Sequence, residues 1–337
     1  MPFIPAVASP SLGHQTVHPI KRRLKAAVSQ GFKLIELVED DITFYTREFI
    51  GETNNDNMIE GARRIKGICD TLGIKPCILQ PFWFYEGLED REEHAKRIKK
   101  LKLWMKLAKH LDIQLVQIPT NWLSQGTTGN MDVIVKDLVE MAEIGLAEQP
   151  PISFAYEGVA WGTHIDTWEG TLEVVKKVNR PNFGLCLDTY HIVARAWGDP
   201  TKPGCKGENG DQRLKESINR LVQELDVSKV FYVQLCDAEL LDAPLVEGHP
   251  FHSPEQLPRM AWSRNARLFA WEEEHGGCLP LDALTEALFG TLKFDGLTTM
   301  ETFSRFLFDQ SPETPEKFAK RAWKSWERTM EKIGGYS

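Results

Sequence analysis

The stretch Phe183-Gly-Leu-Cys-Leu-Asp-Thr-Tyr-His191 joins a short apolar run to polar residues at its end. A second stretch, Val230-Phe-Tyr-Val-Gln-Leu-Cys-Asp237, has the same design. Near-continuous apolar runs of this length are typical of strands buried on both faces, as in parallel sheets covered by helices. Six further runs resemble these two, so the predicted strands cover residues 4–9, 34–39, 75–80, 115–119, 152–157, 183–188, 230–235 and 297–303.

Helical patterns lie between these runs. Apolar residues recur at three- and four-residue steps, as in Ile98, Leu101, Met105 and Ala108, and again from Phe318 to Ile333. This spacing is that of one face of an amphipathic helix. Eight strand–helix units predict an α/β protein folded as a closed (β/α)8 TIM barrel, a single domain over residues 1–337.

An open doubly wound sheet is the competing architecture. It normally has a glycine-rich phosphate turn after an early strand, and none is present. One stretch, at about 237–277 between the seventh and eighth predicted strands, is too long for an ordinary connector. We expect it to be a long loop insertion that acts as a lid or binding loop.

Composition excludes several classes of function. The 337 residues include 48 Asp and Glu against 40 Lys and Arg, so the net charge of -8 argues against a nucleic-acid-binding protein. No apolar run reaches the roughly 18 residues of a membrane span. Residues 1–5 lack the features of a signal peptide, and the six cysteines show no C-x-x-C spacing. We therefore expect a cytoplasmic protein that binds a small molecule; a homo-oligomer is compatible with the sequence.

Four polar residues follow the last four predicted strands: Glu157, Asp188, Gln234 and Glu301. In a TIM barrel these positions converge at the C-terminal end of the strands, where the active site lies. Three converging carboxylates repel one another unless a cation joins them. Carboxylate and amide oxygens suit Mg²⁺ or Mn²⁺. The alternative interpretation is that these residues only begin loops and cap helices.

Other polar and aromatic residues also have two interpretations. His191 is a general acid or base, or a structural loop residue. The segment Ser263-Arg-Asn-Ala-Arg267 either grips a substrate carboxylate or is solvated surface charge. Six aromatic residues after strands three to five either line a site for a ring-shaped substrate or pack in the core: Phe82, Trp83, Phe84, Tyr85, Trp122 and Trp161.

Several longer segments point to a family. They are Leu-Gln-Pro-Phe (79–82), Asp-Arg-Glu-Glu-His (90–94), Gln-Ile-Pro-x-Asn (117–121), Val-Asn-Arg-Pro-Asn-Phe-Gly-x-Cys-Leu-Asp-Thr (178–189) and Trp-Ser-Arg-Asn-x-Arg-Leu-Phe (262–269). Through these segments the chain resembles the xylose isomerase-like TIM barrels. Within that group it is similar to the fungal 3-dehydroshikimate dehydratases of quinate catabolism.

The resemblance implies a metal-dependent elimination of water from 3-dehydroshikimate that gives protocatechuate (3,4-dihydroxybenzoate). It also implies roles for individual residues. The metal ligands are then Glu157, Asp188, Gln234 and Glu301. They bind one divalent ion, and the resemblance favours Mg²⁺ or Mn²⁺ over Co²⁺ or Zn²⁺. The catalytic residues are His191 and Glu157, and the substrate-binding residues are Ser263, Arg267, Gln80 and Asn121. A metal-dependent sugar or keto-acid isomerase or epimerase on the same barrel is the alternative, because it also removes a proton next to a carbonyl.

Overall fold

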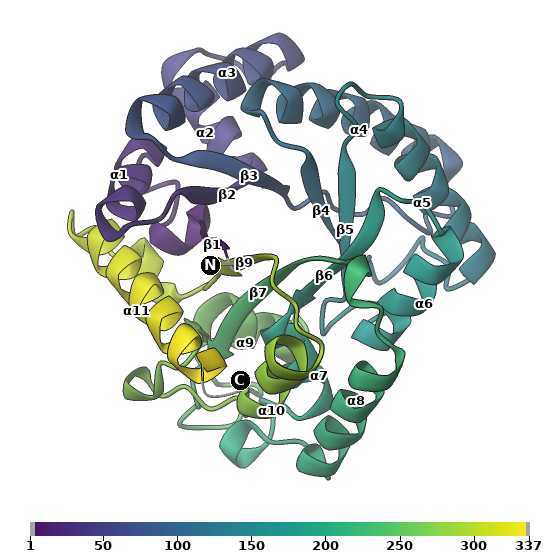
Figure 1. The fold of residues 1–337 in the computed structure, drawn as a ribbon, viewed down its shortest axis with the longest axis vertical. Coiled ribbons are helices and arrows are strands. Elements are labelled where there is room, and N and C mark those ends of the chain that lie inside the picture. The colour runs from purple at the N-terminus through teal and green to yellow at the C-terminus, as the bar shows by residue number, and fades with distance from the viewer. Residues whose placement is uncertain (1–3, 335–337) are drawn as a thin grey trace.

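The computed structural model describes residues 4–334, so residues 1–3 of the segment inspected for a signal peptide lie outside it. Eight parallel strands close into a barrel in which β6 pairs with β7, β7 with β9 and β9 with β1. Figure 1 shows the helices arranged around these strands. The predicted TIM barrel is therefore confirmed. Within residues 4–334, no helix is long and apolar enough to cross a membrane.

The element boundaries match the predicted ones closely. The barrel strands are β1 (Ile4–Ala8), β2 (Leu34–Val38), β3 (Lys75–Gln80), β4 (Leu115–Pro119), β5 (Ser153–Glu157), β6 (Phe183–Asp188), β7 (Val230–Ala238) and β9 (Leu297–Met300). The α-helices are α1 (Ile20–Gln30), α2 (Glu39–Phe49), α3 (Asn55–Leu72), α4 (Arg91–Leu111), α5 (Met131–Leu146), α6 (Trp168–Val178), α7 (Thr189–Ala196), α8 (Gly210–Glu224), α9 (Pro258–Ala266), α10 (Asp282–Thr285) and α11 (Thr314–Gly334). Short helical turns are η1 (Ser9–Leu12), η2 (Pro203–Cys205), η3 (Val227–Lys229), η4 (Glu273–His275), η5 (Glu286–Thr291) and η6 (Arg305–Phe308).

The segment predicted as a long loop is more regular than expected. It contains helix α9 and a short strand, β8 (Arg267–Phe269), which pairs antiparallel with the end of β7. A three-residue strand and a helix of nine residues are too short for hydrophobic periodicity to reveal. The consequence is that Ser263 and Arg267 lie on ordered elements at the barrel mouth.

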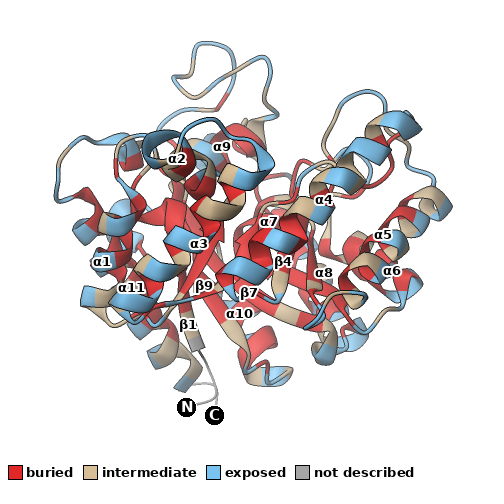
Figure 2. Ribbon diagram, turned by 90° about the horizontal axis from the view of Figure 1, so that it is seen from above, coloured by how far each residue is buried: buried red, intermediate tan, exposed pale blue. Residues whose placement is uncertain are grey.

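Burial follows the expected layers. Figure 2 shows the strands and the inner faces of the helices as buried, and the outer helix faces as exposed. Side chains at strand ends fix where helices begin: Asp188, the last residue of β6, accepts a hydrogen bond from the backbone N–H of His191 in the first turn of α7. One residue thus ends a strand, caps a helix and places His191 beside the strand ends.

A buried ion pair joins the first two strand–helix units. Arg23 on α1 lies 2.5 Å from a carboxylate oxygen of Asp41 on α2, and both side chains are buried. Arg23 also donates hydrogen bonds to the carbonyl oxygens of Ser9 and His18, at 2.9 Å each. Removing one partner of such a pair leaves an uncompensated buried charge.

We predict that Arg23→Met lowers the free energy of unfolding by about 3–5 kcal/mol, because Asp41 then remains buried without its cation. The measurement is urea denaturation followed by circular dichroism. Arg22→Met is the matched control: its pair with Glu316 is half exposed, so the expected change is about 1 kcal/mol or less. Equal losses in the two variants would contradict the prediction.

Candidate active site at the C-terminal end of the barrel

The four predicted ligand residues lie together, and all are buried. Asp188 at the end of β6 and Glu301 just after β9 share one guanidinium nitrogen, Nη1 of Arg267, at 2.7 Å from each. Gln234 on β7 donates from Nε2 to Oε1 of Glu301 at 2.9 Å. Glu157 at the end of β5 accepts a hydrogen bond from Gln117 on β4. Convergence of strand ends in the barrel explains why residues so far apart in sequence meet.

A fourth carboxylate, Glu36 on β2, belongs to the same cluster. Its Oε1 accepts hydrogen bonds from the hydroxyl of Tyr232 at 3.0 Å and from Nε2 of Gln234 at 3.2 Å. Its Oε2 is buried without a hydrogen-bond partner. Glu36 lies within a predicted strand, 34–39, and the sequence analysis did not assign it to the site.

The cluster carries excess negative charge. Burial, together with Asp188, raises the pKa of Glu157 well above its usual range. Burial and Glu301 do the same for the pKa of Glu36, and burial raises the pKa of Glu301 to about 7. Burial opposes ionisation of Asp188 as well, but the charge of Arg267 and the contacts with His191 and Cys236 together outweigh it and lower the pKa of Asp188. One guanidinium therefore stabilises only part of this set of carboxylates.

His191 is held in a defined protonation state. Its Nδ1 accepts a hydrogen bond from the backbone N–H of Ala160 at 3.0 Å, and burial lowers the pKa of the imidazole to about 3. The ring is therefore neutral at pH 7, and both of its nitrogens face donors, the backbone N–H of Ala160 and Nη2 of Arg267. Its Nε2 lies 3.8 Å from a carboxylate oxygen of Glu157 and 3.8 Å from one of Asp188.

Arg267 is enclosed on every side. Its Nε donates to the hydroxyl of Ser263 at 3.1 Å, and its Nη2 lies 3.1 Å from Nε2 of His191. The guanidinium stacks over the ring of Tyr190 at 4.5 Å. Arg264, in the same sequence segment, is exposed. Of the expected pair, Arg267 thus contacts the carboxylates of the cluster, and Ser263 contacts Arg267.

The remaining two predicted substrate residues have protein partners. Gln80 at the end of β3 donates to Oε1 of Glu301 at 2.9 Å. Asn121, after β4, donates from its side chain to the carbonyl oxygen of Glu86 at 3.0 Å and accepts from the backbone N–H of Leu123 at 2.9 Å. Their contact with substrate stays a prediction.

The loop between β3 and α4 is anchored by buried polar residues. Glu86 accepts hydrogen bonds at Oε1 from the backbone N–H of Asn121 and the hydroxyl of Tyr156, at 2.8 and 3.0 Å. Its Oε2 is buried without a hydrogen-bond partner. Burial raises the pKa of this carboxyl to about 7.

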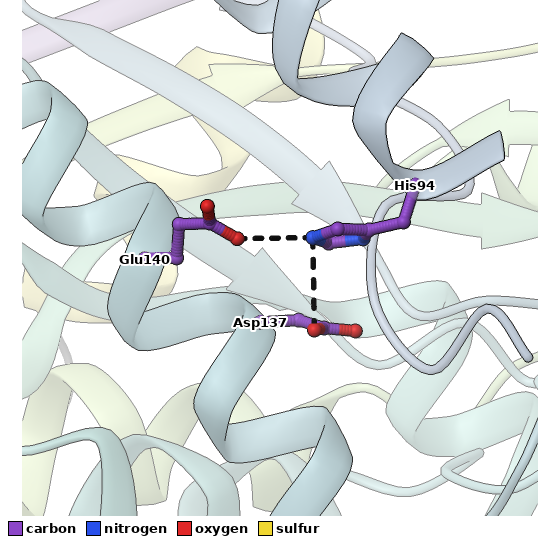
Figure 3. A group of neighbouring side chains, drawn as sticks. All are labelled: His94, Asp137 and Glu140. Atoms are coloured by element: carbon purple, nitrogen blue, oxygen red, sulfur yellow. Dashed lines mark hydrogen bonds and ion pairs between the residues drawn. The ribbon is translucent and has the colours of Figure 1, made fainter. Parts of the chain in front are cut away.

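A second group fixes the other end of this loop. His94 contacts Glu140 at 3.0 Å and Asp137 at 3.6 Å, and its Nδ1 lies 3.1 Å from the carbonyl oxygen of Tyr85 (Figure 3). Asp137 also pairs with Arg91 at 2.6 Å. The spacing of His94, Asp137 and Glu140 is compatible with binding of a metal ion. Because Arg91 already neutralises the charge of Asp137, we interpret the group as a structural contact that holds α4 against α5.

The main cluster suits a divalent cation better. Its donors are carboxylate and amide oxygens, which are hard ligands, and the buried carboxylates outnumber the single guanidinium. The spacing of Glu157, Asp188 and His191, and of Asp188, Cys236 and Glu301, is compatible with metal binding. The two buried unpartnered oxygens, Oε2 of Glu36 and Oε1 of Gln117, are consistent with a missing positive partner.

The residues of the site that we did not predict have only a weak signature in the sequence. Glu36 and Gln117 are polar residues inside apolar strands, which marks them as inward-facing without indicating a role. Glu86 lies in an irregular loop, where no periodicity indicates which side chains turn inward.

Comparison with known proteins identifies the class. The family model of the xylose isomerase-like TIM barrels matches residues 24–326, so the chain belongs to that family. Among solved structures, the IOLI protein, described with a bound zinc atom, superposes with a TM-score of 0.71 at 20% identity and covers 99% of both chains. At that identity the likeness concerns the fold.

Individual proteins of similar sequence point to a narrower group within this family. The chain is 41% identical to the 3-dehydroshikimate dehydratase of Neurospora crassa, over 99% of this chain and 95% of that enzyme. It is 26% identical to the 3-dehydroshikimate dehydratase of Pseudomonas aeruginosa over 74% of this chain, which spans 31% of that longer protein. The resemblance drawn from the sequence segments is thereby confirmed.

We predict that Glu86→Gln changes how stability depends on pH. The folded-state pKa of about 7 lies above the unfolded value near 4.3, so wild-type stability falls as pH rises between those two values. Glutamine binds no proton, so the variant gains stability relative to wild type across this window, by about 4 kcal/mol in total. Urea denaturation at a series of pH values is the measurement.

The matched control for this comparison is Glu173→Gln, since the side chain of Glu173 is more than half exposed. Its difference from wild type should be small and independent of pH. A difference between Glu86→Gln and wild type that stays constant with pH would contradict the assigned titration.

Proposed function

We propose that this protein is a hydro-lyase that converts 3-dehydroshikimate into protocatechuate and water. The observation that carries the proposal is the 41% identity to the Neurospora crassa enzyme over nearly the full length of both chains. The buried carboxylate cluster with a neutral histidine beside it supplies the chemistry that this reaction needs. The quinate-catabolic role and the cytoplasmic location are part of the same proposal.

We assign the metal ligands to Glu157, Asp188, Gln234 and Glu301, and Mg²⁺ or Mn²⁺ as the ion because these donors are hard oxygens. A bound divalent ion would polarise the substrate ketone and stabilise the enolate charge that develops on proton removal. Glu36 holds the amide of Gln234 from the opposite side, at 3.2 Å, and so orients this ligand.

Two proton movements must balance in the elimination. The carbon next to the ketone loses a proton, and the hydroxyl on the following carbon leaves as water after gaining one. Glu157 and His191 lie 3.8 Å apart, close enough to act on neighbouring ring carbons. Glu157 in its ionised form accepts the carbon-bound proton and delivers it to the departing hydroxyl, so that one proton moves and none is left over, and the neutral imidazole of His191 beside it assists this transfer.

The substrate-binding roles follow from charge and position. Arg267 is the cation that contacts two carboxylates of the cluster, and Ser263 fixes its orientation through Nε. A guanidinium in this position can also bind an oxygen of the substrate. Gln80, at the end of β3, contacts Glu301, and Asn121 follows the end of β4; these two residues complete the proposed substrate-binding set.

The first test is turnover with and without metal. We expect purified protein with Mg²⁺ or Mn²⁺ to convert 3-dehydroshikimate to protocatechuate, followed by ultraviolet absorbance and chromatography. Removal of the ion with EDTA should abolish the product, and adding the ion back should restore it. Absence of product with metal demonstrably bound would reject the dehydratase assignment and favour the sugar or keto-acid isomerase alternative.

Two substitutions separate metal binding from proton transfer. Glu157→Gln should abolish turnover and lower the bound metal, measured by elemental analysis. His191→Ala should retain metal and lower turnover by about 10²–10⁴-fold, the range for loss of acid–base catalysis. Glu173→Gln, at the exposed face of α6, is the control and should match wild type. Near wild-type turnover of metal-free Glu157→Gln would contradict the metal assignment.

A further inference from the structure

A row of aromatic side chains leads from the protein surface to His191. Trp83 is 41% exposed and packs edge-on against Trp122, with the two ring centroids 5.6 Å apart. Trp122 packs against Trp161 at 6.4 Å, and Trp161 against the imidazole of His191 at 4.8 Å. These residues lie in the loops after β3, β4 and β5. The last member of the row, Trp161, therefore lies next to the proposed catalytic histidine, as Tyr190 also does.

Trp161 differs from five other buried tryptophans in its hydrogen bonding. Its residue is 8% exposed, and its indole Nε1 is buried without a hydrogen-bond partner. Five other buried tryptophans of the described chain donate from Nε1 to a protein oxygen: Trp104, Trp168, Trp197, Trp262 and Trp271. A buried donor without an acceptor is costly and calls for an explanation.

The unpartnered donor is held in a rigid position. The backbone N–H of the preceding residue, Ala160, bonds to Nδ1 of His191 at 3.0 Å. The following residue, Gly162, sits in a tight turn, where an added Cβ would lie 1.9 Å from the carbonyl oxygen of Ile165. Both neighbours of Trp161 thus tie it to the site, and rotation of the loop cannot easily supply an acceptor.

Nearby donors have partners of their own. Arg267 directs Nη1 to Asp188 and Glu301 and Nε to Ser263, while Asn121 donates to the carbonyl of Glu86. Apart from Trp161, the buried side-chain nitrogen without a partner in residues 4–334 is Nε of Arg22, on α1. The indole N–H of Trp161 is therefore a buried donor that remains available to a bound molecule.

We infer, on the basis of the proposed dehydratase function, that Trp161 donates a hydrogen bond from Nε1 to the carboxylate of the substrate and thereby selects for it. In 3-dehydroshikimate the ketone and its neighbouring hydroxyl lie across the ring from the carboxylate. If those two oxygens face the carboxylate cluster, the substrate carboxylate faces outward, past His191. Trp161 lies on that side, between His191 and Trp122.

The test is Trp161→Phe, which keeps an aromatic ring and removes the N–H. We expect the KM for 3-dehydroshikimate to rise about 10-fold or more, as for loss of a hydrogen bond to a charged group, with kcat within about 3-fold of wild type. The melting temperature should not fall, because the lost donor had no protein partner. Trp168→Phe is the matched control: it breaks a hydrogen bond to Ser217 at 2.7 Å, so it should lower the melting temperature and leave KM unchanged.

A binding experiment identifies the group that accepts the hydrogen bond. Isothermal titration of the metal-loaded protein with protocatechuate, which has the carboxylate, and with catechol, which lacks it, compares the two ligands. Trp161→Phe should weaken protocatechuate binding about 10-fold and leave catechol binding unchanged. An unchanged KM and protocatechuate affinity would overturn the inference, and so would an equal loss of affinity for both ligands. If wild type shows no turnover, the proposed function fails, while the protocatechuate comparison still decides the role of Trp161.

Discussion

The structure depends on the concentration of negative charge at one end of the barrel. Glu36, Glu157, Asp188 and Glu301 are all buried there, and within the described residues Arg267 is the guanidinium that pairs with two of them. Burying like charges at this density is unfavourable unless a cation or protons compensate. Such a cluster is therefore useful to the protein through the ligand that it binds. The electrostatics therefore define the site before any ligand is considered.

This constraint extends to the residues around the carboxylates. Tyr232 and Gln234 donate to Glu36, and Gln80 donates to Glu301, so most carboxylate oxygens have a fixed direction. Because these donors come from barrel strands, the site is built on rigid elements. Side chains held in this way need little rearrangement when charge develops during a reaction.

The barrel could be predicted because its strands are buried on both faces. Each strand is then a nearly continuous apolar run, and the polar residue that ends it marks the mouth of the barrel. Asp188 and Glu301 were found in this way. Glu36 was not assigned, because one acidic residue inside an apolar strand does not reveal whether it faces the cluster. Helix α9 and strand β8 were missed for a different reason, since pairing with the end of β7 stabilises elements too short to have a pattern.

The loops and the strands contribute different groups to the site. The strand ends hold the charges that suit the chemistry, while the loops after β3, β4 and β5 supply a row of aromatic rings that ends at His191. These loops are irregular, yet buried polar residues fix them: Glu86 joins the first to the second, and His94 joins the first to α5. A ring-shaped substrate that carries oxygens at both ends fits such a division. The strand ends would recognise the end that reacts, and the loops the end that distinguishes one substrate from another.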